Sequence, residues 1–193
     1  MSMLDVKTLG LENQRMARPP GERDTIDEKI EVWLREIPDL DARTEGVVDR
    51  IGMIQKYLRR THDETLEQFG LTWGEVKVLS SLRYGGPPYQ STPGKLGSQL
   101  GLSSGAMTAR LDKMEEAELI RRLPDPADRR GVLIELTDRG RELWEQTIAV
   151  QAEKEAIVAA ALTEREQDQL NGLLRRLVIA FADEYGPLSK RRA

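Results

Sequence analysis

The residues with the clearest chemical potential are arginines gathered in one short segment. From Leu119 to Gly131 the chain has four arginines, at 121, 122, 129 and 130, and two aspartates, at 125 and 128. Arginine binds phosphate, and an extended guanidinium suits a narrow, electronegative minor groove. Asp128 stands where its carboxylate could hold one of the next two guanidinium groups extended through a bidentate contact. We expect Asp128, Arg129 and Arg130 to contact DNA, with a solvated loop as the alternative.

A predicted helix from Ser103 to Ala117 precedes this basic segment. Met107, Leu111 and Met114 recur at helical spacing and predict a buried stripe. The opposite face is built of small residues, which would let the helix approach the floor of a major groove. An ordinary surface helix is the alternative. The residues expected to contact DNA from this helix are Ser103, Ser104, Gly105, Thr108 and Lys113.

The neighbouring elements favour DNA binding. Thr92 and Pro93 predict the start of a short helix that ends at Gly101, just before Ser103 caps the next one, and this spacing is typical of a helix-turn-helix. Segments 119–123 and 132–136 have strand character and predict a β-hairpin with a long basic tip. The expected fold is therefore mainly α with a small β-hairpin wing, a winged helix-turn-helix.

The rest of the chain divides into an arm, an extra helix and long flanking helices. Residues 1–24 have no periodicity and predict a flexible N-terminal arm, whereas residues 25–43 predict an extra helix and a linker. Residues 44–185 form the expected winged-helix domain, with its DNA-binding lobe at 72–137 and amphipathic helices at 44–69 and 163–185. Capping boxes begin helices at Thr72 and at Thr163, and Thr137 is expected to cap a helix that runs to about Ala161.

Composition excludes several other classes of protein. The 193 residues include no cysteine and one histidine, which leaves no thiol chemistry and no histidine-rich metal site. Phosphate-binding and dinucleotide-binding loops are also absent, so we expect neither an enzyme nor a cofactor. No apolar run is long enough for a bilayer, and we expect a cytoplasmic protein without a membrane partner. The net charge of −4 does not exclude DNA, because local basicity decides DNA binding.

These motifs together resemble the MarR family. The sequence DRR at 128–130, followed after five residues by LT at 136–137, is similar to that family's wing motif. The segment LSSGAMT at 102–108 resembles the start of its recognition helix, and PDP at 124–126 resembles its wing. The resemblance covers roughly residues 47–183. It implies an intertwined homodimer, joined through its N-terminal and C-terminal helices, that represses transcription from a pseudo-palindromic double-stranded DNA operator.

The extra helix with Trp33 resembles the urate-responsive branch of that family. The resemblance implies an effector pocket formed by Trp33, Arg110 and Arg122, with Lys77 where the branch has an aspartate. A cation at that position removes a partner for the N–H groups of urate and adds one for carboxylates. The implied effector is thus a small anion, either like citrate or aconitate or like urate.

Two of these features have an alternative explanation. Arg110 lies at the margin of the predicted apolar stripe, away from the face expected to meet the bases, and a structural salt bridge would explain that position as well as an effector would. The whole protein could also be a ligand-blind winged helix with an architectural or protein-interaction role. Release of DNA by an effector distinguishes these functions.

Overall fold

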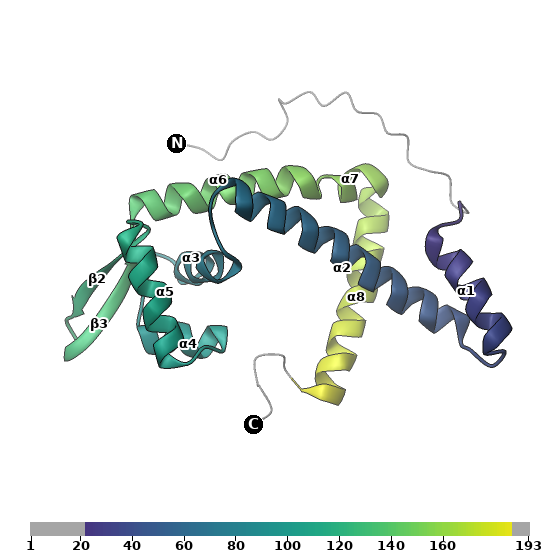
Figure 1. Ribbon diagram of the computed structural model, residues 1–193, viewed down its shortest axis with the longest axis horizontal. Coiled ribbons are helices and arrows are strands. Elements are labelled where there is room, and N and C mark those ends of the chain that lie inside the picture. Colours follow the sequence, from purple (N-terminus) through teal and green to yellow (C-terminus); the bar gives the residue numbers. More distant parts are fainter. Residues whose placement is uncertain (1–21, 187–193) are drawn as a thin grey trace.

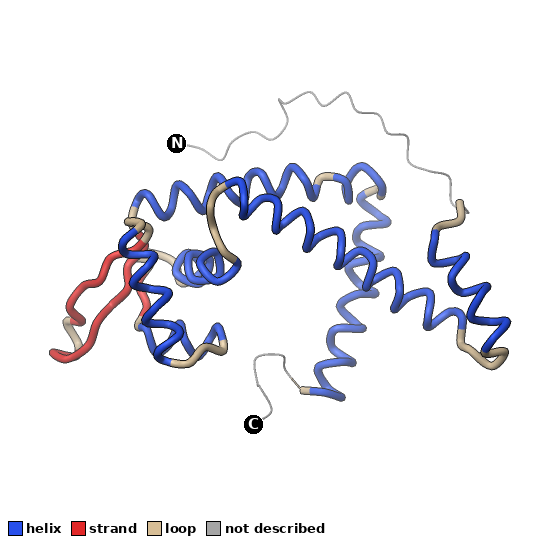
Figure 2. Tube along the Cα trace, viewed as in Figure 1, coloured by secondary structure: helices blue, strands red, loops and turns tan. Residues whose placement is uncertain are grey.

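The computed structural model describes residues 22–186 and shows a mainly helical chain with one small sheet (Figure 1, Figure 2). A compact lobe with the sheet lies at one end of the molecule and α1 lies at the other, with the long α2 between them (Figure 1). The elements are, in order, α1 (Thr25–Glu36), α2 (Ala42–Gln68), α3 (Trp73–Tyr84), β1 (Gln90–Ser91), α4 (Pro93–Leu100), α5 (Ser104–Glu116), β2 (Ile120–Asp125), β3 (Asp128–Leu136), α6 (Asp138–Glu155), α7 (Ile157–Ala161) and α8 (Glu164–Tyr185).

The lobe has the predicted winged helix-turn-helix architecture. Its three strands are antiparallel in the order β1-β3-β2, with Ile120 opposite Leu136 and Ser91 opposite Ile134. The helix-turn-helix is formed by α4 and α5, joined through Gly101, which adopts the left-handed conformation that favours glycine. Strand β1 was not predicted, because two residues are too few to show an alternating pattern.

One apolar core joins the helices of the lobe to its sheet. Every helix from α3 to α5 contributes side chains with no more than 1% exposure, and β2 and β3 close the core from the side. Burial of this kind stabilises a side chain by roughly 1.5–3 kcal/mol. The fully buried members are Val78, Leu79, Leu82, Leu96, Met107, Leu111, Met114, Ile120 and Ile134.

The lobe is connected to the rest of the chain through the crossing of α2 and α6. Thr65 and Gln151 are both buried there, and the Thr65 hydroxyl donates to Gln151 Oε1 at 3.1 Å. Lys154 Nζ donates to the carbonyl oxygen of Thr61 at 3.1 Å. Buried polar groups that are paired in this way favour a single crossing geometry.

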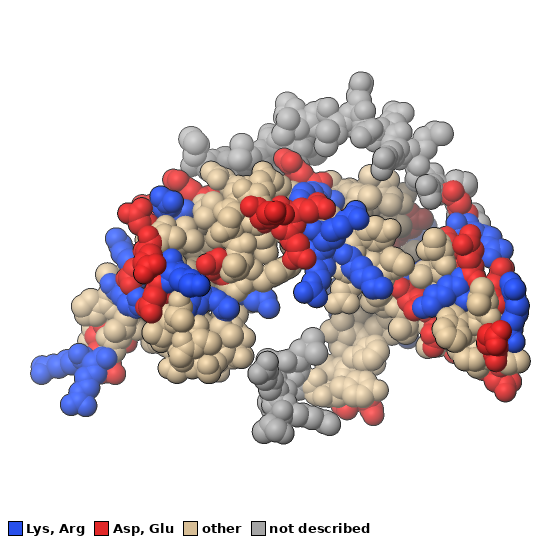
Figure 3. Space-filling view, viewed as in Figure 1, with Lys and Arg blue, Asp and Glu red and all other residues tan. Residues whose placement is uncertain are grey.

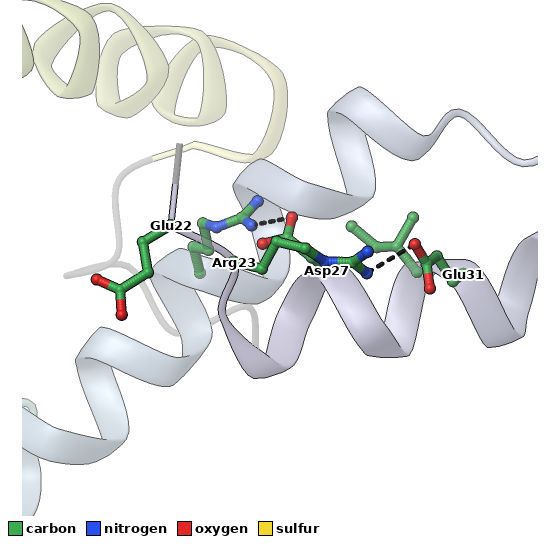
Figure 4. Close-up of a pocket in the computed structure, with 6 residues that line it drawn as sticks. Glu22, Arg23, Asp27 and Glu31 are labelled. Carbon is green, nitrogen blue, oxygen red and sulfur yellow. Dashed lines mark hydrogen bonds and ion pairs between the residues drawn. The ribbon is translucent and has the colours of Figure 1, made fainter. Parts of the chain in front are cut away.

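Helix α1 is held against α2 by charge. Asp24 caps α1, and its carboxylate accepts from Arg50 Nε at 2.9 Å, while Asp27 accepts from Arg50 Nη2 at 2.6 Å. These contacts hold the pKa of both carboxyl groups below the usual range, chiefly through the Arg50 hydrogen bond for Asp24 and the backbone N–H of Asp24 for Asp27. An open pocket of about 520 Å³ lies between the two helices, and Arg23 pairs with Glu31 along it (Figure 4). Its two arginines are thus already bound by acids.

The long helices leave large apolar surfaces uncovered in the single chain. No residue of α8 is buried, although its sequence is amphipathic. Exposed apolar side chains on α8 include Leu170, Leu173, Val178, Ile179 and Phe181, and those on α2 include Val47, Val48, Ile51, Ile54 and Tyr57. Contiguous apolar surface of this extent is typical of an interface between protein chains.

Some predicted boundaries differ from the observed ones. Helix α2 starts at Ala42 rather than near Thr44, because the Asp41 carboxylate caps it. The helix expected to run from Thr137 to Ala161 is divided at Ala156 into α6 and α7. The predicted N-terminal arm lies outside the described residues except for its last three, of which Asp24 caps α1.

The close contact between Leu119 and Gly140, where the chain enters and leaves the wing, predicts an effect on stability. The carbonyl oxygen of Leu119, between α5 and β2, lies so close to Gly140 that a Cβ atom there would overlap it. We expect Gly140→Ala to lower the free energy of unfolding by about 1–3 kcal/mol, as overpacking does. Urea denaturation followed by circular dichroism measures this change.

Gly94→Ala is the matched control, because a Cβ atom at Gly94 in α4 would meet nothing within 4 Å. That substitution should be neutral or stabilise the fold by up to about 1 kcal/mol. Equal destabilisation by both variants would contradict the proposed overlap.

Candidate nucleic-acid interface

The exposed face of α5 carries the residues predicted to meet DNA. Ser103 caps the helix, and its Oγ accepts from the backbone N–H of Ala106 at 3.3 Å. Around Gly105 the space is open, since a Cβ atom there would meet nothing within 4 Å. The face is therefore small, exposed and able to approach another surface closely; its predicted members Ser103, Ser104, Gly105, Thr108 and Lys113 are all exposed.

The tip of the wing is tighter than predicted. Strand β2 continues to Asp125 and β3 resumes at Asp128, so the expected long tip is a short turn. Asp128 does not hold a guanidinium as expected; its Oδ1 accepts the backbone N–H of Arg130 at 2.9 Å. The carboxylate thus shapes the backbone of the turn. Both aspartates approach Gly131, where a Cβ atom would lie 2.9 Å from Asp125 Cβ and 3.1 Å from Asp128 Cβ.

Two arginines of the wing present unpaired charge. Arg129 and Arg130 are exposed, and within residues 22–186 neither guanidinium has an acidic partner. Positive side chains gather at the tip of the hairpin formed by β2 and β3 (Figure 3). A protruding, unneutralised pair of cations is suited to contact with the phosphates or the minor groove of DNA.

Arg121 and Arg122, the other two arginines of segment 119–131, are paired with acids of the lobe. Arg121 on β2 binds Glu135 on β3, which also accepts from Gln90 on β1. The Gln90 hydrogen bond, followed by Arg121, outweighs burial and lowers the pKa of Glu135. Arg122 binds Asp112 and Glu115 of α5 instead. These pairings were not predicted, because partners far apart in the chain leave no local pattern.

Arg110 reaches the first turn of α3, the helix that also carries Lys77. The guanidinium of Arg110, from α5, covers Gly74, where any Cβ atom would overlap it. Lys77 lies one turn beyond Gly74 on α3 and is exposed. Among the residues from 22 to 186, neither Lys77 nor Arg110 has an ion-pair partner.

The structure does not bring the other two predicted effector residues to this pair within one chain. Trp33 lies on α1, at the opposite end of the molecule from α5 (Figure 1). Arg122 binds Asp112 and Glu115, which at about 100° per residue project from the flank of α5 opposite to Arg110. Of the four predicted effector residues, a single chain therefore places only Lys77 and Arg110 near the N-terminal end of α3.

Other kinds of site are not found in the described part of the chain. Across residues 22–186, no group of three or more acidic or histidine side chains is arranged to hold a metal ion. Over the same range no helix has both the length and the apolar character that a membrane span requires.

The lobe, its exposed recognition helix and its basic wing define a winged-helix DNA-binding transcriptional regulator, and comparison with known proteins agrees. Residues 71–132 match the model of the MarR family. Over 152 residues the chain is 30% identical to the HTH-type transcriptional regulator PecS of Dickeya dadantii (strain 3937), covering 79% of this chain and 92% of that relative. The chain belongs to the MarR family, whose members form dimers and regulate transcription rather than catalyse reactions.

Solved structures agree with this assignment. A MarR mutant from E. coli complexed with operator DNA is 28% identical, with a TM-score of 0.53 over 76% of this chain and 97% of that one. YusO from Bacillus subtilis is 24% identical, with a TM-score of 0.64 over 74% of this chain and 99% of that chain, and shows the same fold. The predicted family and fold class are thus confirmed.

The unpaired wing arginines generate a prediction about affinity. We expect Arg130→Ala to weaken DNA binding by about 1–3 kcal/mol and to flatten its salt dependence, because a charged groove contact is lost. Fluorescence anisotropy with a labelled duplex, selected from random DNA by the wild-type protein, measures both effects.

Arg139→Ala is the control, because Arg139 lies on α6 and pairs with Glu118 at 3.4 Å. Its removal should change affinity by less than about 0.5 kcal/mol. The wing assignment fails if Arg130→Ala binds as tightly as the wild-type protein.

Thr108 generates a separate prediction about sequence preference. Contacts to base edges specify a site, whereas contacts to phosphates position the protein. We therefore expect Thr108→Ala to relax discrimination at one position of each half-site, by about 1–3 kcal/mol for the preferred base. Selection from random DNA followed by sequencing reveals the change, and an unaltered selected sequence would show that Thr108 does not face the bases.

Proposed function

We propose that this protein is a homodimeric repressor that a small anion releases from a pseudo-palindromic operator. The observation that carries the DNA-binding part is the pairing of an exposed, small-residue face on α5 with a wing whose Arg129 and Arg130 are unneutralised. The helix would enter the major groove and the wing the adjacent minor groove. Ser103, Ser104, Gly105, Thr108 and Lys113 would contact DNA from the helix, and Arg129 and Arg130 from the wing.

The dimer would form through the uncovered faces of α2 and α8. Both helices expose apolar side chains that a single chain leaves in water, such as Ile54 at 56% and Phe181 at 59%. Burying such surface against a second copy is favourable by roughly 25 cal/mol per Å². Two lobes related by a two-fold axis would then read two halves of a pseudo-palindrome.

The effector site would centre on Lys77 and Arg110. Within the described residues 22–186, these two cations have no acidic partner. They would repel each other, and an anion placed between them would remove that repulsion. Arg110 extends from α5 itself, so an anion bound there would act directly on the helix expected to enter the DNA.

The chemistry of the pair favours carboxylates over urate. Two cationic side chains offer N–H donors and no acceptor, and urate needs acceptors for its ring N–H groups. A compact polycarboxylate such as citrate or aconitate can bind both cations at once. In this arrangement Trp33 would reach the effector only from the second protomer, and Arg122 would remain with its own acids.

The proposal generates a prediction about effector binding. We expect citrate or aconitate to bind the wild-type protein and to lower its DNA affinity, because an effector that prefers the DNA-free conformation shifts the population towards it. Arg110→Ala and Lys77→Ala should each weaken effector binding by about 10-fold or more, the cost of losing a charged hydrogen bond. Isothermal titration calorimetry with citrate, aconitate, urate and salicylate measures these affinities.

Lys95→Ala is the matched control, since Lys95 is an exposed lysine on a different helix, α4. It should bind the effector as the wild-type protein does. If Arg110→Ala keeps full effector affinity, the site lies elsewhere; if urate binds best, the inference from Lys77 is wrong. DNA binding that responds to none of these anions would favour the ligand-blind winged helix instead.

A further inference from the structure

Arg122 joins two elements that are both expected to contact DNA. It lies on β2, at the base of the wing, and its side chain reaches back to α5. Its Nη2 donates to Asp112 Oδ1 at 2.7 Å, its Nη1 donates to Glu115 Oε2, and its backbone N–H donates to Glu115 Oε1 at 2.9 Å. One residue thus makes three charge-assisted hydrogen bonds to two acids on one flank of the recognition helix.

These contacts are partly shielded from water. The side chain of Arg122 is 28% exposed and that of Glu115 is 38% exposed, whereas Arg121, the neighbour of Arg122 on the same strand, is 62% exposed. Burial opposes the charge on Arg122, but the hydrogen bonds that it donates to Glu115 and Asp112 outweigh this effect and raise the pKa of the guanidinium. A planar guanidinium that bridges two carboxylates restricts the orientation of both elements more than a single ion pair would.

We propose that Arg122 is a positioning residue of the DNA interface, which holds the wing at a defined angle to the recognition helix by bridging Asp112 and Glu115. This role differs from the effector contact that the family resemblance implies for Arg122. The proposal rests on the proposed wing contact, because Arg130 can gain from a defined angle only if it touches DNA.

The bridge also determines the charge that DNA meets. Asp112 is exposed and follows Thr108 by one turn, on the side of α5 expected to face the bases. Without Arg122, two carboxylates would stand unneutralised near DNA phosphates and repel them. Arg122 thus neutralises two acids that would otherwise repel DNA at the interface.

A double-mutant cycle between Arg122 and Arg130 tests the positioning role. If the bridge positions the wing, Arg122→Ala should weaken DNA binding about 10-fold, and Arg130→Ala should cost about fivefold less in that background than in the wild type. Arg122→Lys keeps the charge but can no longer bridge both acids as a fork, so Arg130→Ala should cost less in that background too. Anisotropy with the selected duplex measures all four corners of each cycle.

Arg121→Ala is the matched control, because it removes an arginine from the adjacent position of the same strand. Its partner Glu135 lies on β3, inside the hairpin, so its loss leaves the angle between hairpin and α5 unchanged. We expect no coupling between Arg121 and Arg130. Thermal unfolding of every variant, followed by circular dichroism, verifies that the lobe remains folded at the temperature of the binding assay.

The outcomes separate this proposal from the function on which it rests. If Arg130→Ala alone leaves affinity unchanged, the wing contact itself is wrong. If Arg130→Ala weakens binding equally in the wild-type and Arg122→Ala backgrounds, the wing touches DNA but Arg122 does not position it. If Arg130→Ala costs as much in the Arg122→Lys background as in the wild type, charge alone suffices and the bridge is not the cause.

Discussion

The burial of one stripe of α5 is the constraint on which the DNA-binding lobe depends. Met107, Leu111 and Met114 are each at most 1% exposed, and they pack into the core shared with α3, α4 and the sheet. Because successive residues of a helix are about 100° apart, rotating α5 by one position would take this stripe out of the core. The face with Ser104 and Thr108 must therefore point to solvent, whatever else the lobe does.

The four arginines of the wing fall into two groups, those paired with acids of the lobe and those without an acidic partner among the described residues. Arg121 pairs with Glu135, and Arg122 pairs with Asp112 and Glu115. Arg129 and Arg130 have no acidic partner within residues 22–186. This division explains how a chain with a net charge of −4 can present a basic wing. Arg121 joins the two strands of the hairpin and Arg122 joins the hairpin to α5, whereas Arg129 and Arg130 leave positive charge at its tip.

Polar contacts also join the helices outside the lobe. The crossing of α2 and α6 is specified by the buried Thr65–Gln151 hydrogen bond, and α1 is attached to α2 through Arg50 and its two aspartates. Between these polar junctions the long helices keep apolar faces that a single chain cannot cover.

The sequence by itself determined the elements whose causes are local. Capping boxes at Thr72 and Thr163 and the apolar stripe of α5 predicted the helices correctly, because caps and helical faces involve residues only three or four positions apart. The tertiary structure alone decided which charges are free. Glu135 binds Gln90, 45 positions away, and Arg122 binds Asp112 across two elements, while Asp128 binds backbone rather than a guanidinium. Such pairings depend on distances created by folding, so the sequence carries no periodic signal of them.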